Sequence, residues 1–284
     1  FCCSRLALGA CRQEGIQEVF ATGWMDNGAE TPIDAIWPGL AVFSFLCFHE
    51  DLYEEELSTY FRDCIDGNLE DFLLLDSLDS LFKGSGKNLT ADNPSKYLLY
   101  QDPMLGLFDF HLKDVDTRTY YQSLGDKLKT ISETPGEYQE FFRFYAYLAL
   151  VLAQKADLGL RIKSAYDAGD LSTLKEISEE VIPNIQKDLA QMHTARENLW
   201  FTDAKAFGYE LLDIRLEGVK ARLKNCQRRI RSWLEGQTSR LEELEQERLP
   251  YWELGNMNPQ DPKAELRENL WDKIISGCDL VDTV

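Results

Sequence analysis

The sequence predicts a mostly helical protein in which one short α/β unit precedes a large α-helical bundle domain. Three observations indicate this fold class. A strand-favouring run near the N-terminus lies between two helical patterns, strand patterns largely disappear after residue 50, and a seam of apolar residues at heptad spacing occupies the last third of the chain. We therefore expect two domains, residues 1–50 and residues 51–284, in a chain long enough for both to have a core.

The first 50 residues have the pattern of a helix, a strand, a loop and a second helix. Residues 4–14 are helical in pattern and stop at Gly15, and residues 16–22 favour extended backbone through β-branched and aromatic side chains. Pro38 then opens a helix in which residues 40–48 are nearly all apolar. Because one strand cannot form a stable sheet, we expect its partner strands to come from the rest of a larger protein or from another chain.

Helical patterns dominate after residue 50. Asp51 and Glu54 resemble a capping box at the start of a helix, and residues 68–82 form a second helical stretch. Residues 84–95 are polar and predict a loop. The apolar stretch 97–112 is interrupted by proline and glycine, so we expect it to be irregular.

Three long helices are predicted next, over about residues 137–168, 171–198 and 207–249. Pro183 lies inside the second helix and should kink it. The third helix carries the heptad seam, whose members are Leu212, Leu216, Val219, Leu223, Cys226, Ile230 and Trp233, with Leu241 and Leu244 resuming it after Gly236. Such amphipathic helices bury their apolar faces best in an antiparallel bundle. The last residues, 250–284, predict a loop and a short helix.

Composition argues against several classes of partner. The net charge of −19 opposes the electrostatic attraction that drives binding to nucleic acid or to an anionic membrane. No apolar run reaches the roughly 18 residues that span a bilayer. The seven cysteines form no C-x-x-C pair and the three histidines are far apart, so we expect reduced thiols in a cytoplasmic protein and no metal site. The chain begins with Phe1, so a signal peptide upstream is left open.

The loop after the predicted strand is the candidate functional site. It contains Trp24, Asp26, Asn27 and Glu30 within seven residues. An indole face can stack on a pyranose ring while carboxylates and amides hydrogen-bond the hydroxyl groups around its edge, so the loop is a candidate sugar site. The alternative is an ordinary turn in which Trp24 belongs to the core. We do not expect Asp26 and Glu30 to form a catalytic acid/base pair by themselves.

Two further clusters have structural and functional interpretations. The basic run Lys220, Arg222, Lys224, Arg228, Arg229 and Arg231 lies away from the heptad seam and predicts a solvated face, with a polyanion site as the alternative. Residues 200–210 mix aromatic and charged side chains between two long helices. They predict a packed inter-helix corner, with a surface that braces a neighbouring barrel as the alternative.

Several segments together resemble family 20 glycoside hydrolases, most closely a bacterial branch. Residues 11–30 resemble the last barrel strand of that branch, which reads roughly T-x-W-G-D-D-G-x-E, and Trp37 to Leu40 resembles the L-P-G-L that opens the next helix. Residues 100–109 resemble Y-Q-D-P-L-L-G-L-F-D, and residues 205–210 and 242–245 fit its helical C-terminal domain. The matches span nearly the whole chain in order.

The resemblance implies an exo-acting β-N-acetylhexosaminidase with a (β/α)8 barrel. In that family the substrate's own acetamido oxygen attacks the anomeric carbon, an Asp orients the acetamido group and a Glu is the general acid/base, so no cofactor is implied. The catalytic pair lies on an earlier strand, so we expect this chain to hold the last βα unit, no catalytic residue and no activity of its own. The implied partners are a terminal N-acetylhexosamine and the rest of the protein's own barrel.

Carried over to this sequence, Trp24 would line the sugar pocket, and Asp26, Asn27 and Glu30 would face its hydroxyl groups. Met25 stands where the family has Gly, and Asn27 stands where it has Asp. The heptad seam and long helices alone also fit a non-enzymatic helical scaffold or interaction protein, which is the rival interpretation.

Overall fold

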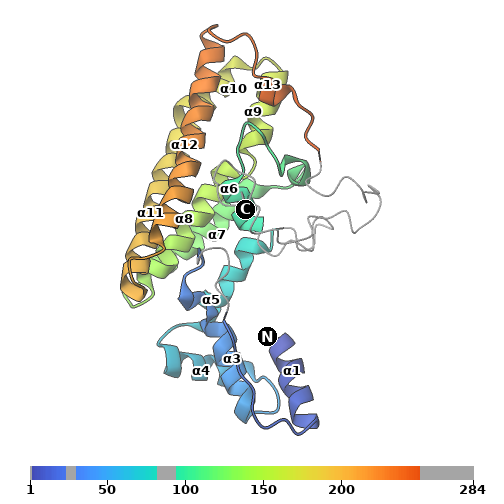
Figure 1. Ribbon diagram of the computed structural model, residues 1–284, viewed down its shortest axis with the longest axis vertical. Coiled ribbons are helices and arrows are strands. Elements are labelled where there is room, and N and C mark those ends of the chain that lie inside the picture. Colours follow the sequence, from blue (N-terminus) through green and yellow to red (C-terminus); the bar gives the residue numbers. More distant parts are fainter. Residues whose placement is uncertain (1, 24–29, 82–93, 250–284) are drawn as a thin grey trace. The chain divides into compact units, whose positions relative to one another are not determined.

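A computed structural model describes residues 2–23, 30–81 and 94–249 (Figure 1). The chain divides into two compact units, Phe1–Asp76 and Ser77–Val284. All the regular elements in the described ranges are helices, which confirms the prediction of a mostly helical protein with a helical C-terminal domain. Within those ranges, no helix is both long enough and apolar enough to cross a membrane.

The N-terminal unit consists of short helices around a small apolar core. Its elements are α1 (Cys2–Gln13), η1 (Ile33–Ile36), α3 (Trp37–Phe48), α4 (Glu54–Ile65) and α5 (Leu69–Leu73). Helix α3 packs against α1, α4 and α5 and supplies fully buried side chains such as Val42 and Leu46. The two helices predicted within residues 1–50 are thus present, and Pro38 lies in the first turn of α3.

Residues 16–22 do not form the predicted strand. The segment has no regular secondary structure, and Ile16 and Phe20 are 52% and 88% exposed. A strand is defined by a ladder of hydrogen bonds to a neighbour, and none of the described residues provides that neighbour. The described residues therefore do not confirm the predicted barrel unit.

The start of α4 also differs from the prediction. Tyr53 occupies the N-cap position and makes no side-chain cap, so the capping box of Asp51 and Glu54 is wrong. The Asp51 carboxylate instead accepts a hydrogen bond from the Leu52 amide at 2.8 Å and pairs with Arg5 at 3.3 Å. These local contacts hold the pKa of Asp51 below its usual value.

The chain after α4 is helical in short pieces. Asn68 caps α5 by accepting a hydrogen bond from the Glu70 amide at 3.0 Å, and η2 (Leu74–Asp79) follows. Most of the predicted 84–95 loop lies outside the described residues. Its last two residues begin helix α6 (Pro94–Tyr100), and η3 (Asp109–Leu112) ends the stretch that was predicted to be irregular.

The C-terminal unit is built on four long helices that lie side by side (Figure 1). They are α7 (Thr117–Ser132), α8 (Gln139–Lys155), α11 (Ile182–Asp203) and α12 (Tyr209–Leu234). Helix α8 packs against both α7 and α11, and α11 packs against α12. Short connections join α7 to α8 and α11 to α12, so these neighbours are antiparallel. The seam residues of α12 from Leu212 to Ile230 are buried as predicted.

Each of the three predicted long helices is shorter or more broken than its pattern suggested. The first is divided at Ala156 and Asp157 into α8 and α9 (Leu158–Asp167). The second consists of α10 (Leu171–Glu176), the π-helical turn η4 (Ile177–Val181) and α11. Proline lacks an amide hydrogen, so Pro183 disrupts the regular ladder, and a π turn lies just before it.

The third predicted helix ends well before residue 249. Helix α12 stops at Leu234, and Gly236 has a φ of 72°, a left-handed conformation that ends a helix. Residues 237–249, which we call the C-terminal strap, then pack against α9 and contain only α13 (Glu242–Glu245) as regular structure. The apolar side chains Leu241 and Leu244 are fully buried, although not on the same helix as the seam.

Candidate functional site

The predicted sugar loop lies largely outside the described residues. Trp24, Asp26 and Asn27 are in that part, and only Glu30 is described, with its side chain half-buried. On the near side of the loop, Gly23 is closely packed, since a Cβ there would lie 3.3 Å from the Ile36 side chain. The structure therefore fixes the two ends of the candidate site and does not test the arrangement of its four residues.

An apolar groove lies beside the ends of this loop. It has a volume of about 640 Å³ and runs between α1, residues 19–23 and α3. Leu8 and Cys11 contribute from α1, and Leu40 and Phe43 contribute from α3. An open apolar groove beside exposed apolar side chains is a surface that another part of a protein would normally cover.

A second polar site is formed by residues 101–109, the segment that resembles Y-Q-D-P-L-L-G-L-F-D. The Gln101 side chain accepts a hydrogen bond from the Phe108 amide at 2.9 Å and donates to the Ala156 carbonyl at 3.1 Å. The Asp102 carboxylate accepts hydrogen bonds from the Met104 amide at 2.8 Å and the Leu105 amide at 3.2 Å. The segment is thus folded by its own side chains rather than by a backbone ladder.

Charged side chains from distant elements complete this site. The Lys155 amine, on α8, donates to the carbonyls of Leu98 at 3.1 Å and Gln101 at 2.7 Å. Arg222, on α12, pairs with Asp102, whose side chain is only 2% exposed. These contacts tie the segment to two helices of the bundle.

Asp109 and Arg248 form a deeply buried ion pair. Arg248 Nε lies 3.1 Å from Asp109 Oδ2, and the two side chains are 5% and 0% exposed. Burial raises the pKa of Asp109 to about 6, although the positive charges of Arg248 and Lys155 oppose this rise. With both partners out of solvent, the arrangement serves to hold chain segments together rather than to act on a substrate.

Three members of the basic run have partners in distant segments, so the prediction of a solvated face is wrong for them. Arg222 pairs with Asp102, Arg229 pairs with Glu243 at 2.8 Å, and Arg231 donates to Ser178 Oγ at 3.3 Å. A local charge pattern cannot reveal such partners. Lys220 instead pairs with the exposed Glu217 on its own helix, at 2.5 Å. Lys224 and Arg228 are exposed as predicted.

The corner between α11 and α12 is packed as predicted, but only on its inner side. Trp200 and Tyr209 are buried with ring centroids 5.7 Å apart, and the Trp200 indole donates to the Lys205 carbonyl at 2.7 Å. Phe201 and Phe207 are 53% and 86% exposed on the outer side. The structure does not test the alternative of a surface that braces a barrel.

A shallow hollow of about 770 Å³ lies along α7. Its polar side chains include Gln122, Asp126 and Gln154. Gln122 donates to Asp126 at 2.9 Å, and Gln154 donates to Asp188 on α11 at 3.0 Å. Among the described residues, no group of three or more His, Cys, Asp and Glu side chains is arranged to hold a metal ion.

The sequence did not predict the buried polar contacts of Lys155, Asp109 and Arg248. Two signals were present, because Lys155 ends an apolar stretch of α8 and Asp109 lies between two phenylalanines. A charged residue among apolar neighbours indicates a buried partner, although it does not say which residue that partner is.

Comparison with known proteins agrees with this architecture. Residues 70–262, more than half of the chain, match the family model described as the glycoside hydrolase 20C C-terminal domain. The search of curated proteins found no match. The chain therefore belongs to the C-terminal part of the family 20 glycoside hydrolases, the family that its motifs resemble.

Proposed function

We propose that this chain is part of an exo-acting β-N-acetylhexosaminidase that removes terminal N-acetylhexosamine residues with retention. The family match over residues 70–262 is the observation that carries the proposal. In this proposal residues 1–50 are the last βα unit of a (β/α)8 barrel, and residues 51–284 are the helical domain that follows it.

The proposed mechanism is substrate-assisted. The acetamido oxygen of the substrate attacks the anomeric carbon as the glycosidic bond breaks, and the Glu protonates the departing oxygen. This Glu, and the Asp that orients the acetamido group, come from an earlier barrel strand. Trp24 stacks on the sugar ring, while Asp26, Asn27 and Glu30 hydrogen-bond its hydroxyl groups. The chain alone is then inactive, and the reaction needs no cofactor.

Two features of the N-terminal unit support the barrel part of the proposal. Residues 16–22 carry exposed apolar side chains, including Val19 at 39% and Phe20 at 88%, and they border the apolar groove. A strand that pairs with neighbours in a barrel would bury such side chains. The rest of the barrel is the partner that this surface fits.

A bacterial cytoplasmic location is also part of the proposal. The cysteines with described side chains, Cys11, Cys47, Cys64 and Cys226, are free thiols. Free thiols at exposed positions such as Cys47 and Cys64 suit a reducing compartment.

Kinetics of the complete enzyme test the sugar-holding role. With an aryl β-N-acetylglucosaminide as substrate, we expect Trp24→Ala and Asp26→Asn each to lower kcat/KM by roughly 10- to 100-fold, since each removes a direct substrate contact. The matched control is Asp63→Asn, which changes an exposed carboxylate on α4 and should leave kcat/KM unchanged.

The proposal has three distinct ways to fail. Unchanged kcat/KM in both loop variants would remove the sugar site from this loop. Turnover by the present chain alone, lost on substitution of Asp26 or Glu30, would show that the catalytic groups lie here and not on an earlier strand. A complete protein without glycosidase activity would favour the helical scaffold.

A further inference from the structure

The C-terminal strap is attached to the rest of its unit mainly by side chains. It has one four-residue helix, α13, and its apolar anchors are the fully buried Leu241 and Leu244. A segment with few buried apolar contacts and little regular backbone bonding has a low local stability. The polar contacts of the strap therefore determine how firmly it is attached.

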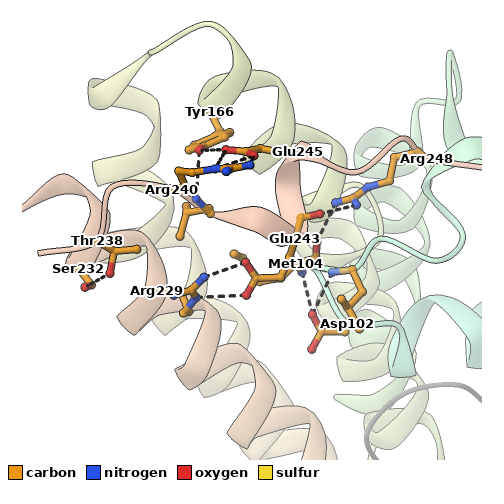
Figure 2. A network of polar contacts seen from close by, with 12 residues as sticks. Asp102, Met104, Tyr166, Arg229, Ser232, Thr238, Arg240, Glu243, Glu245 and Arg248 are labelled. Carbon is orange, nitrogen blue, oxygen red and sulfur yellow. Dashed lines mark hydrogen bonds and ion pairs between the residues drawn. The ribbon is translucent and has the colours of Figure 1, made fainter. Parts of the chain in front are cut away.

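Helix α9 makes the first set of contacts (Figure 2). The Tyr166 hydroxyl accepts a hydrogen bond from the Leu241 amide at 3.1 Å and donates to Glu245 Oε1 at 3.0 Å. The Lys163 amine, also on α9, donates to the Leu244 carbonyl at 2.5 Å. Arg240 within the strap pairs with Glu245, but its side chain is 63% exposed.

Helix α12 makes the second set of contacts. Arg229 donates to both carboxylate oxygens of Glu243, at 2.8 and 3.2 Å, as Figure 2 shows. The two side chains are 32% and 29% exposed. Water therefore screens this pair and can replace either partner, so it contributes modestly to attachment.

Arg248 makes the third set of contacts, and these are buried. Its guanidinium reaches the Met104 carbonyl at 2.9 Å, the Asp109 carboxylate at 3.1 Å and the Glu243 carbonyl at 3.2 Å. The pocket around Asp109 has no spare room, because a Cβ on Gly159 would lie 2.6 Å from Asp109 Oδ2. If Arg248 left, a buried carboxylate and a buried carbonyl would lose their shared donor.

We propose that the strap is a latch that undocks as a unit while the four-helix body stays folded, and that the Arg248–Asp109 pair controls its release. Arg248 ties the strap to the Met104 carbonyl and the Asp109 carboxylate of the 101–109 segment. Residues 101 and 102 remain fixed, since Lys155 and Arg222 hold them from the bundle. The proposal does not depend on the sugar chemistry proposed above.

Hydrogen exchange of the full chain, resolved to single amides, tests the latch. In Arg248→Met we expect at least tenfold faster exchange at the amides of Leu241 and Leu244 in the strap. The Gln101 amide, which bonds to the Tyr97 carbonyl at 2.9 Å, should keep its wild-type rate. The amides of α8 and α11 should also be unchanged.

Two more variants separate the latch from general destabilisation. Arg240→Met removes the exposed pair within the same strap and should change exchange less than threefold. Asp109→Leu keeps the size of the side chain but removes the acceptor of the Arg248 guanidinium, and should accelerate exchange in the strap as Arg248→Met does. Equal acceleration throughout the bundle, or wild-type protection of the strap in either Arg248→Met or Asp109→Leu, would overturn the proposal.

Discussion

At the residue scale, Lys155 shows how a charged group stabilises the interior of this domain. Its side chain is only 1% exposed, and its amine donates to two carbonyls at the C-terminal end of α6. The C-terminal end of a helix carries partial negative charge and carbonyls without a helical partner, so an ammonium group is favourable there. Asp109 adds a nearby opposite charge.

The first prediction concerns this lysine. Lys155→Met keeps most of the side-chain volume but leaves the carbonyls of Leu98 and Gln101 buried without this donor, so we expect a loss of about 2–4 kcal/mol in the free energy of unfolding. Urea denaturation measures the loss. Lys224→Met, at an exposed position on α12, is the control and should cost less than about 0.5 kcal/mol. A loss below about 1 kcal/mol in Lys155→Met would contradict the assigned role.

Asp109 and His111 give opposite dependences of stability on pH. Burial raises the pKa of Asp109 from 3.8 to about 6 and lowers the pKa of His111 from 6.5 to about 4. Asp109 binds its proton more tightly in the folded state than in the unfolded state. Its contribution to the free energy of unfolding is therefore present below pH 4 and is lost as the pH rises through 6. The His111 contribution is present above pH 6.5 and is lost as pH falls through 4.

The second prediction is that Asp109 and His111 give opposite slopes of stability against pH. Each pKa shift changes the free energy of unfolding by about 3 kcal/mol at most, so in the wild type the two pH dependences nearly cancel between pH 4 and 6.5. In Asp109→Asn, the free energy of unfolding should rise with pH across that window. In His111→Gln, it should fall with pH. Chemical denaturation at a series of pH values measures both slopes, and equal slopes in the two variants would contradict this account.

At the element scale, close contact between α9 and the segment 101–109 depends on a glycine. Gly159 lies in the first turn of α9, where a Cβ would approach both oxygens of the Asp109 carboxylate at 2.6 and 2.8 Å. Such a contact forces either the carboxylate or the helix to shift.

The third prediction is therefore that Gly159→Ala lowers the free energy of unfolding by about 1–3 kcal/mol, despite the higher helix propensity of alanine. Thermal unfolding of the full chain, which contains both units, measures it. Gly39→Ala in α3 is the control, because a Cβ there meets nothing within 4 Å and should stabilise its helix by about 0.5–1 kcal/mol. A stabilising Gly159→Ala would show that the contact with Asp109 is not tight.

Most helices could be predicted from sequence, and the errors have physical causes. The seam of α12 was clear because Leu212, Leu216 and Leu223 repeat at heptad spacing. Helix α7 was missed because its face is largely polar, with Leu124 and Leu128 among few buried apolar side chains. The break at residues 156–157 leaves no mark in an apolar pattern, because it follows from tertiary contacts of the 101–109 segment.

At the scale of the whole molecule, the sequence predicted the family and the helical character, and the family match confirms both. The candidate sugar site could be predicted only through the resemblance, since a tryptophan with nearby carboxylates also fits an ordinary turn. The buried network around Asp109 could not be predicted, because its members are separated by up to 144 residues along the chain. Partners at such separations are specified by the fold and not by local pattern.

The central claim is that Trp24, Asp26, Asn27 and Glu30 hold a terminal sugar at the last strand of a barrel. A crystal structure of the complete enzyme with bound N-acetylglucosamine tests it most directly. We expect residues 16–22 to pair with strands on both sides, the Trp24 ring to stack on the sugar, and the Asp26 carboxylate to accept a hydrogen bond from a sugar hydroxyl within about 3 Å. A sugar bound away from this loop, or residues 16–22 without strand partners, would contradict the claim.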